Sequence, residues 1–327
     1  MLERFLARLT PVSFVLEETP WRQFHMSRHT GNMSGRTWLV YLVSAALTLT
    51  FFASGLWPQI ASPASAQVIM TGTAADSINA KWLALGGTQG VLGPAVSDVQ
   101  TFAVAGAQVR YFQNGAIIWS ASTGAHDVYG AIMARYSSLG NAVATLGLPT
   151  SGEKAAFGGR MNTFTGGNVT WNANTGQTTV TYYSNLRHPR TGQPFYPNVI
   201  RWAPTASHVL ADTNIDLAYL PGVLAQVQQE SAGNPNAVNN WDSNWRAGIA
   251  SFGLLQTIAP TYQRYAPPGQ RGQLQYVVVN GVSQQYVPEM VVPYNNLYAG
   301  INYAISVYGV SRLELWRSGV NQAFSVQ

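Results

Sequence analysis

Residues 220–235 read LPGVLAQVQQESAGNP, and this stretch decides how the second half of the chain is interpreted. Val223 and Val227 recur at helical spacing, and Pro221 suits the first turn of a helix. The pattern predicts a helix that starts near Thr213. Glu230 comes seven residues after Val223, so on a helix it falls on the apolar stripe and not on the solvated face.

A carboxylate on an apolar stripe is unusual in a chain with only 9% charged residues. Gln226, Gln228 and Gln229 are expected on the other faces of the helix. Desolvation would raise the pKa of Glu230 and favour its protonated form near neutral pH. A general acid for glycosidic cleavage needs that form. On the stripe alone a second interpretation stays open, in which the helix frays at Glu230 and the side chain reaches water.

The composition narrows the class of protein. The 327 residues are 46% hydrophobic, which allows a sizeable core, and they include 10 Trp and 16 Tyr. Such aromatics suit either a core or a neutral polar ligand such as a sugar. There are no cysteines, so disulfides and thiol nucleophiles are excluded. The net charge of +5 comes without a Lys/Arg cluster, so no nucleic-acid partner is expected. The five histidines show no ligand spacing, so we expect neither a metal site nor a cofactor.

Residues 1–66 are predicted to form a leader. An uncharged apolar run spans residues 38–56, and Ala64-Ser65-Ala66 follows with the small-x-small pattern of a signal peptidase site. Cleavage after Ala66 would give a secreted or cell-wall protein. The run is also long enough to span a bilayer, so an uncleaved leader would be the membrane anchor.

An internal repeat spans residues 76–180. The two copies share paired Leu-Gly steps and a Gly-x-x-x-Trp motif that ends at Trp119 in the first copy and at Trp171 in the second. The period is 54 residues at the Leu-Gly pairs, as from Leu92 to Leu146. Each copy is predicted to form a short helix, a Gly/Pro loop and a β-hairpin, and Asn114-Gly115 is the expected turn of the first hairpin.

These repeats resemble the LGFP repeats of actinobacterial cell-wall proteins. The second copy has the loop sequence LGLP (146–149), whereas the first departs from the pattern with LGPA (92–95). The resemblance implies wall anchoring, with arabinogalactan as a candidate partner. The paired Gly-x-x-x-Trp hairpins make Trp119 and Trp171 the candidate wall contacts. The alternative is a folded spacer that binds no ligand.

Residues 181–208 are rich in Pro, Arg and Tyr and show no clear period, so they are predicted to form an extended linker. His188 and His208 are isolated histidines in or at the end of this stretch. Such residues are usually solvated, and that is what we expect of both.

Residues 209–327 are predicted to form a second domain. Several short motifs occur in it, and their order along the chain is more specific than any one of them alone. Glu230-Ser231 is followed by Gly253-Leu254-Leu255-Gln256 and then by Ala299-Gly300-Ile301-Asn302-Tyr303-Ala304. Together they resemble the soluble lytic transglycosylase family, which has a lysozyme-like, mainly α-helical fold.

The resemblance implies a role for each matching residue. Glu230 corresponds to the catalytic acid, and Ser231 to a residue that helps hold it. Leu255 and Gln256 correspond to substrate contacts, and Tyr303 is a candidate for a further aromatic contact. Two features depart from the family pattern. Residues 268–292 form a longer insert, with a predicted hairpin at 275–287 that could wall a glycan groove, and no Ala-Tyr-Asn element follows the Ala-Gly-x-x-Tyr segment.

The whole chain is therefore predicted to be an α+β secreted protein that cleaves peptidoglycan glycan strands. A transglycosylase needs one acid/base residue, because the MurNAc C6 hydroxyl replaces water as the nucleophile. A lysozyme-type hydrolase needs a second carboxylate, for which Asp242 is the candidate by position, although Asp242 also suits a turn residue that bonds the local backbone. A non-catalytic wall-binding protein is the other alternative. An acyltransferase has little support, since no G-x-S-x-G motif occurs.

Overall fold

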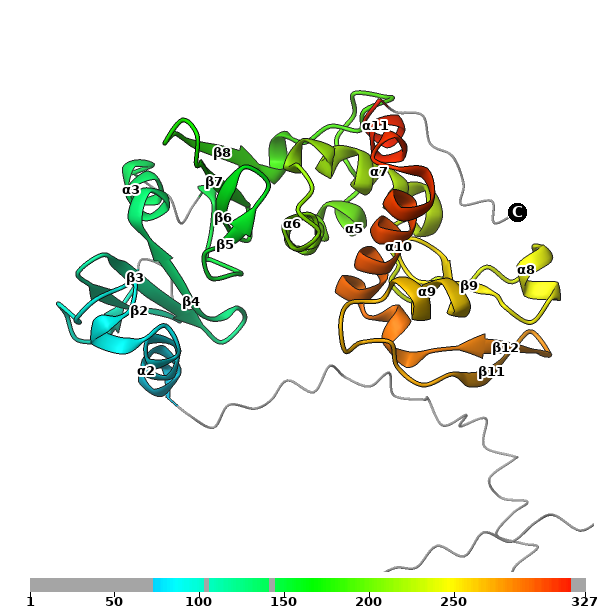
Figure 1. The fold of residues 1–327 in the computed structure, drawn as a ribbon, viewed down its shortest axis with the longest axis horizontal. Helices are drawn as coiled ribbons and strands as arrows, with labels where there is room; N and C mark the ends of the chain where they lie inside the picture. The colour runs from blue at the N-terminus through cyan, green and yellow to red at the C-terminus, as the bar shows by residue number, and fades with distance from the viewer. Residues whose placement is uncertain (1–72, 103–105, 141–144, 319–327) are drawn as a thin grey trace, which may run out of the picture. The chain divides into compact units, whose positions relative to one another are not determined.

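The computed structural model describes residues 73–102, 106–140 and 145–318, which belong to one compact unit (Figure 1). The predicted leader at residues 1–66 lies outside the described residues. Within the described ranges, no helix combines the length and the apolar character that a membrane span requires.

The chain has a mixed α and β architecture with several small antiparallel sheets, as the sequence predicted. Each repeat is a helix followed by a four-stranded sheet whose strands are neighbours in chain order. The elements of the first repeat are α2 (Ala74–Ala84), β1 (Gln100–Thr101), β2 (Ala107–Phe112), β3 (Gly115–Ser120) and β4 (Gly124–Tyr129), with the short 3-10 helix η1 (Gly87–Gln89) after α2. Those of the second are α3 (Gly130–Ser138), β5 (Lys154–Ala156), β6 (Gly159–Thr163), β7 (Gly167–Asn172) and β8 (Thr178–Tyr182).

The helix of each repeat holds its Leu-Gly loop through an equivalent hydrogen bond, from an aromatic side chain of the helix to the carbonyl oxygen of the loop glycine. Trp82 Nε1 on α2 donates to Gly93 O at 3.0 Å, and Tyr136 Oη on α3 donates to Gly147 O at 2.9 Å. Both glycines have left-handed backbones, with φ of 71° and 76°. The LGPA loop of the first copy therefore keeps the backbone arrangement of the LGLP loop, in spite of its different sequence.

The glycine of each Gly-x-x-x-Trp motif is required by close packing within the sheet. A Cβ on Gly115 would lie 2.4 Å from Val128 O, and one on Gly167 would lie 2.4 Å from Thr181 O. The predicted hairpin at Asn114 is confirmed, but its two turn residues are Gln113 and Asn114, because Gly115 already pairs with Phe112 in the β2–β3 ladder.

Helices separate the sheets. Helix α2 packs on the first sheet, and α3 contacts both the first sheet and strands β7 and β8 of the second. The apolar core between the two repeats contains Ile118 and Val128 of the first sheet, Ile132 of α3 and Val169 of the second sheet. Helix α6 (Ala203–Asp212) contacts β5, β6 and β7. It therefore lies against the first three strands of the second sheet, whereas α3 contacts β3 and β4, the last two strands of the first.

The stretch predicted as an extended linker is folded and packed. It contains the short 3-10 helix η2 (Tyr183–Asn185), helix α5 (Pro197–Ile200) and the first half of α6. Buried polar groups join α6 to the second repeat. Asn168 Nδ2 lies 3.1 Å from Ser207 Oγ, and Tyr183 Oη donates to Asn168 Oδ1 at 2.7 Å. The polar residues on the sheet-facing side of α6 hide its periodicity in the sequence.

The expectation that His188 and His208 are solvated is wrong. His188 is buried, its Nδ1 accepts a hydrogen bond from Arg190 N at 3.2 Å, and its ring lies 5.8 Å from that of Phe195. His208 Nε2 is hydrogen-bonded to Thr163 Oγ1 of the second sheet. Burial lowers the pKa of His188, with the charge of Arg190 as a smaller cause.

The rest of the chain is mainly helical. Its helices are α7 (Leu220–Ser231), α8 (Ser243–Arg246), α9 (Ala259–Tyr265), α10 (Pro293–Tyr308) and α11 (Ser311–Arg317), with the 3-10 helices η3 (Leu217–Tyr219) and η4 (Pro288–Val291). Two small sheets pair β9 (Ser251–Phe252) with β10 (Thr257–Ile258) and β11 (Gln275–Val279) with β12 (Val282–Tyr286). The predicted hairpin at 275–287 is thereby confirmed. The main core joins the buried faces of α6, α7, α10 and α11, with Leu254 and Leu255.

Candidate active site

The carboxylate of Glu230 is held by a buried glutamine on its own helix. Gln226 Nε2 donates to Glu230 Oε1 at 2.6 Å. Gln226 is fully buried, and Glu230 is half-buried in the last turn of α7. The expectation that Gln226 lies on another face is therefore wrong. Residues four apart on a helix share a face, so the spacing from Gln226 to Glu230 was a usable signal in the sequence.

A tight turn carries the chain away from Glu230. Ala232 and Gly233 both have left-handed backbones, with φ of 50° and 78°. Ser231 Oγ donates to Val227 O at 3.0 Å and accepts a hydrogen bond from Gly233 N at 3.2 Å. Trp202 Nε1 donates to Gly233 O at 2.9 Å. Ser231 thus fixes the helix end that carries Glu230, which is one physical way to help hold a catalytic acid.

The loop after Glu230 is tied to the Gly253–Gln256 turn. Gly253 N donates to Ala237 O at 2.9 Å, and Val238 pairs with Phe252. Gln256 has a left-handed backbone, with φ of 48°, and its Nε2 donates to Ala237 O at 3.1 Å. A left-handed conformation is unfavourable for a non-glycine residue, so surrounding contacts must hold this turn in place.

Leu255 is fully buried and packs against α10. A Cβ on Gly300 would lie 2.7 Å from Leu255 Cδ1, so the glycine of the Ala-Gly motif makes room for this side chain. A direct contact between Leu255 and a glycan stays a prediction, and the burial of the side chain argues against it. The backbone of Leu255 is held by Asn296, whose Oδ1 accepts from Leu255 N at 2.7 Å.

Asn296 is a structural residue that the sequence analysis missed. It is fully buried, and its Nδ2 donates to Phe252 O at 3.0 Å and to Met290 O at 2.8 Å. One side chain on α10 thus fixes both the Gly253–Gln256 turn and the segment that precedes α10.

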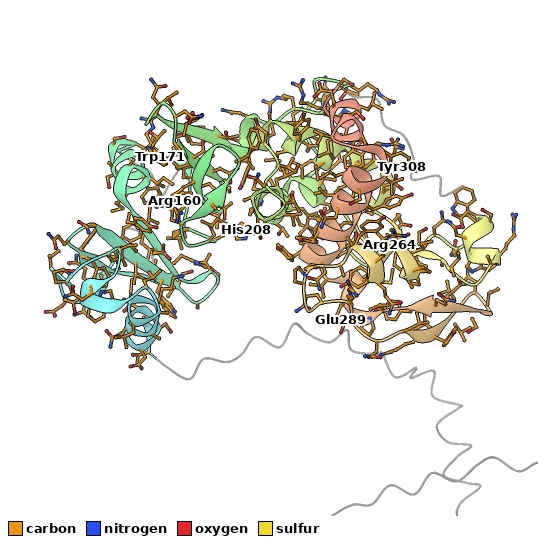
Figure 2. The ribbon with its side chains drawn as sticks, viewed as in Figure 1. Arg160, Trp171, His208, Arg264, Glu289 and Tyr308 are labelled. Carbon is orange, nitrogen blue, oxygen red and sulfur yellow. The ribbon has the colours of Figure 1, made fainter. Side chains whose placement is uncertain are left out.

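Three tyrosines cluster between α9 and α10. The ring of Tyr303 lies 5.5 Å from that of Tyr265 and 5.8 Å from that of Tyr308, and the hydroxyls of Tyr303 and Tyr308 are 3.3 Å apart. Burial, helped by the Tyr308 hydroxyl, raises the pKa of Tyr303 to about 12, so it is neutral at physiological pH. Figure 2 labels Tyr308 on α10 and Arg264 on α9. Tyr303 thus belongs to an aromatic cluster. The sequence did not predict that Tyr265 would be part of it.

Asp242 has a local structural role. Its Oδ1 accepts from Trp245 N at 2.9 Å and so caps α8, and its Oδ2 accepts from Asn239 Nδ2 at 3.0 Å. These contacts agree with the alternative given above, in which Asp242 is a turn residue that accepts hydrogen bonds from its neighbours in the chain.

Trp119 and Trp171 occupy equivalent positions on β3 and β7. Both are half-buried; Trp119 packs against the apolar core of the first repeat, and Trp171 packs against the core between the two repeats. Part of each indole therefore belongs to the core, and only the remaining surface could contact a wall polymer. Among the described residues, no group of three or more His, Asp or Glu side chains is arranged to hold a metal ion.

Two comparisons with known proteins found similarities to this chain. The family model for the LGFP repeat matches residues 92–142 and 146–185. A curated relative, the uncharacterized protein YqbO of Bacillus subtilis (strain 168), is 36% identical over 112 residues. That match covers 34% of this chain but only 6% of YqbO, so the chain spans a small fraction of the length of that relative. Residues 92–185 thus carry LGFP repeats, which point to an association with the cell surface.

Proposed function

We propose that residues 209–327 form a lytic transglycosylase domain, of lysozyme-like fold, that cleaves peptidoglycan glycan strands with Glu230 as its acid/base residue. The observation that carries the proposal is the setting of Glu230. Its carboxylate sits at the end of an apolar helix, half-buried, with one oxygen bonded to the buried amide of Gln226. A positioned carboxyl group that keeps access to solvent is what general acid catalysis requires.

The reaction uses one carboxyl group twice. Protonated Glu230 gives its proton to the oxygen between MurNAc C1 and GlcNAc C4, the bond from C1 to that oxygen breaks, and GlcNAc leaves as an alcohol. Ionised Glu230 then takes the proton of the MurNAc C6 hydroxyl as that oxygen bonds to C1. The product has a 1,6-anhydro ring, no water is consumed, and the acid is regenerated. In the carboxylate stage, the hydrogen bond from Gln226 stabilises the negative charge.

The contacts of Asp242 favour this mechanism over a hydrolase with two carboxylates. A retaining glycosidase places its second carboxyl group about 5–5.5 Å from the acid and leaves it free to attack or to stabilise the sugar. Both oxygens of Asp242 already accept hydrogen bonds within residues 239–245, from Asn239 and Trp245. Using it as a nucleophile would cost α8 its N-cap, which is typically worth about 1 kcal/mol.

The repeats supply the second part of the proposal, which is retention at the cell wall. We infer that the exposed surfaces of the two LGFP repeats bind a wall polysaccharide such as arabinogalactan, with Trp119 and Trp171 as partial contacts. Helix α6 packs on β5–β7 and so joins the second repeat to the proposed catalytic domain. A repeat bound to the wall would therefore hold that domain beside its substrate. Under this proposal the protein is secreted, or is held at the membrane by its leader.

Digestion of purified peptidoglycan followed by mass spectrometry tests the proposal. The wild-type protein should release fragments that end in 1,6-anhydroMurNAc. Glu230→Gln should reduce cleavage by at least about 10²–10⁴-fold, because Gln keeps an acceptor for Gln226 but cannot exchange a proton. Glu314→Gln, which removes a half-exposed carboxylate on α11 that pairs with Arg317, is the matched control and should leave activity unchanged.

Asp242→Asn separates the two mechanisms in the same experiment. A small loss of activity with anhydro products supports the transglycosylase. A loss as large as that of Glu230→Gln, with products that carry reducing ends, would establish the hydrolase instead. Full activity of Glu230→Gln would refute the assignment of the acid, and wall binding without any cleavage by the wild type would leave a non-catalytic wall-binding protein.

A further inference from the structure

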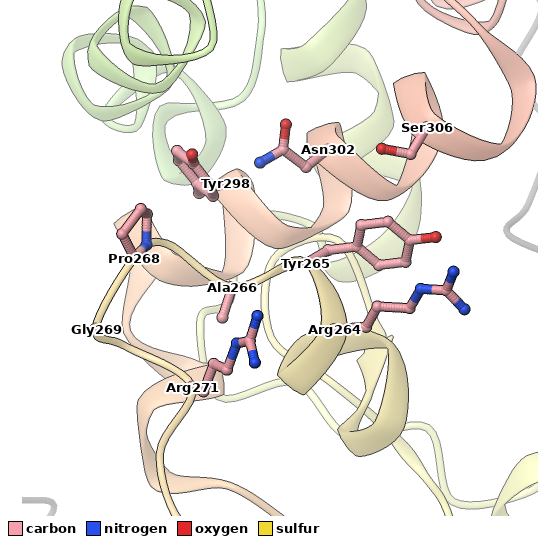
Figure 3. A pocket seen from close by; sticks show the side chains of 9 residues that line it. All are labelled: Arg264, Tyr265, Ala266, Pro268, Gly269, Arg271, Tyr298, Asn302 and Ser306. Carbon is pink, nitrogen blue, oxygen red and sulfur yellow. The ribbon is translucent and has the colours of Figure 1, made fainter.

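A pocket of about 500 Å³ lies between the end of α9, the loop that follows it and one face of α10 (Figure 3). Three of the side chains that line it, Tyr298, Asn302 and Ser306, are four residues apart on α10 and so share a face. Arg264, Tyr265 and Arg271 line the opposite side. We call this site the arginine pocket. Its volume is in the range of small-ligand sites.

The positive charge of the arginine pocket is not neutralised within the described part of the chain. The four ion pairs found there involve other cations, namely Lys81, Lys154, Arg160 and Arg317. The guanidinium group of Arg264 lies over the ring of Tyr265, 5.5 Å from its centroid. Unpaired guanidinium groups are suited to bind carboxylates through two parallel hydrogen bonds.

The guanidinium groups of the two arginines lie at separate places along the pocket, so they would not bind the same anionic group. Figure 3 shows the guanidinium group of Arg271 beside Ala266, and that of Arg264 on the other side, beyond the ring of Tyr265. The hydroxyl and amide groups of Tyr298, Asn302 and Ser306 line the α10 side. Asn302 can both donate and accept hydrogen bonds, which matches a peptide amide. The pocket therefore fits an extended ligand that carries two separated anionic groups and amide groups.

The arginine pocket adjoins the predicted substrate-binding tyrosine. The ring of Tyr265 lines the pocket and also packs 5.5 Å from the ring of Tyr303. A ligand in the pocket would thus lie beside the tyrosine cluster. If the glycan strand contacts Tyr303, the pocket is placed to receive a group attached to that strand.

We propose that the arginine pocket binds the peptide stem of peptidoglycan, with Arg264 and Arg271 each bound to one of its carboxylates. The inference rests on the proposed function, because it assigns a part of the same substrate. A stem peptide has the required chemistry: it carries the free α-carboxylate of its γ-linked D-glutamyl residue and a C-terminal carboxylate, and amide groups separate the two. The pocket would then make the domain select glycan strands that still bear peptides.

Calorimetry with a synthetic stem peptide, L-Ala-γ-D-Glu-L-Lys-D-Ala-D-Ala, tests this directly and needs no cleavage. The double variant Arg264→Gln/Arg271→Gln should bind the peptide at least about tenfold more weakly than the wild type, since each lost ion pair removes charge-assisted hydrogen bonds. The control Arg135→Gln/Arg246→Gln removes the same charge from exposed positions outside the pocket and should bind like the wild type.

Two further probes separate the outcomes. A neutral N-acetylglucosamine oligomer should bind the wild type and the pocket variant equally, which shows that the variant is folded and that the glycan site is separate. Equal affinity of both for the peptide, or no binding of the peptide to the wild type, would overturn the proposal. Binding of a glycerol phosphate oligomer through the same arginines without peptide binding would overturn it in favour of a wall phosphodiester. Because the peptide is not cleaved, none of these results depends on the activity of Glu230.

Discussion

The stability of the protein should fall steeply between pH 6.5 and pH 4 because His208 is half-buried and packed in its neutral form. Thr150 Oγ1 donates to Thr163 Oγ1 at 2.9 Å, so the Thr163 hydroxyl is directed to donate to His208 Nε2. If His208 were protonated, its Nε2–H and the Thr163 O–H would both be donors, and the hydrogen bond between them would be lost. Burial, with the charge of Lys154 as the next cause, lowers the pKa of His208 to about 4, although Asp212 partly opposes the shift.

The size of the effect follows from the difference between the folded and unfolded states. The pKa of an unfolded histidine is about 6.5, so the folded protein binds this proton about 2.5 pH units lower, and each unit corresponds to about 1.4 kcal/mol. The contribution is fully present above pH 6.5 and is lost as the pH falls to 4. His208 alone should therefore lower the free energy of unfolding by about 3 kcal/mol over this range, which is roughly 6–12 °C in Tm for a domain of this size.

The assay is urea unfolding at half-unit steps from pH 7.5 to pH 4, on the wild type and on His208→Gln. Glutamine can accept the hydrogen bond from Thr163 but does not titrate. Other groups, including His126, whose pKa burial also lowers, contribute equally to both proteins and cancel in the difference. The wild type should lose about 3 kcal/mol more than the variant. Parallel curves would refute the assignment of a half-buried neutral histidine between α6 and the second repeat.

Two further predictions concern the site and the repeats. Gln226→Leu should move the descending limb of the pH–rate profile for glycan cleavage to higher pH, because the ionised form of Glu230 loses a donated hydrogen bond and the group stays protonated to higher pH. Gln229→Leu, at an exposed position on the same helix, should not move it, and an unchanged profile for Gln226→Leu would contradict the role given to Gln226. Gly115→Ala and Gly167→Ala should each destabilise the repeats by about 1–3 kcal/mol, since each new Cβ would meet a backbone oxygen at 2.4 Å; a thermal melt of either variant that matches the wild type would show that the sheets can separate without cost.

Much of the local structure could be predicted because its signals lie close together in the sequence. The alternation around Asn114 predicted a hairpin, and the structure pairs β2 with β3 there. The period of 54 residues predicted two equivalent units, and the bonds from Trp82 to Gly93 and from Tyr136 to Gly147 show how similar the two copies are. The apolar spacing before Glu230 predicted the helix, although α7 begins at Leu220 and not near Thr213.

The linker prediction failed for a physical reason. Residues 181–208 show no period because α6 buries polar groups as well as apolar ones. Ser207 and His208 bond to Asn168 and Thr163, which lie about 40 residues earlier in the chain. A polar residue with a partner can be buried at little cost, but the sequence does not show the partner.

The sequence by itself determined the hairpins, the repeat and the position of Glu230 on an apolar helix, because each depends on periodicities of two to four residues or on a repeated motif. Tertiary structure decided which polar groups meet. Asn296 reaches the backbone of Leu255 across 41 residues, and Tyr265 meets Tyr303 to join the arginine pocket to the tyrosine cluster. These pairings depend on how helices and turns pack against each other. Where water is excluded, an unpaired polar group costs more free energy, so these buried hydrogen bonds and charges contribute more to stability than exposed ones do.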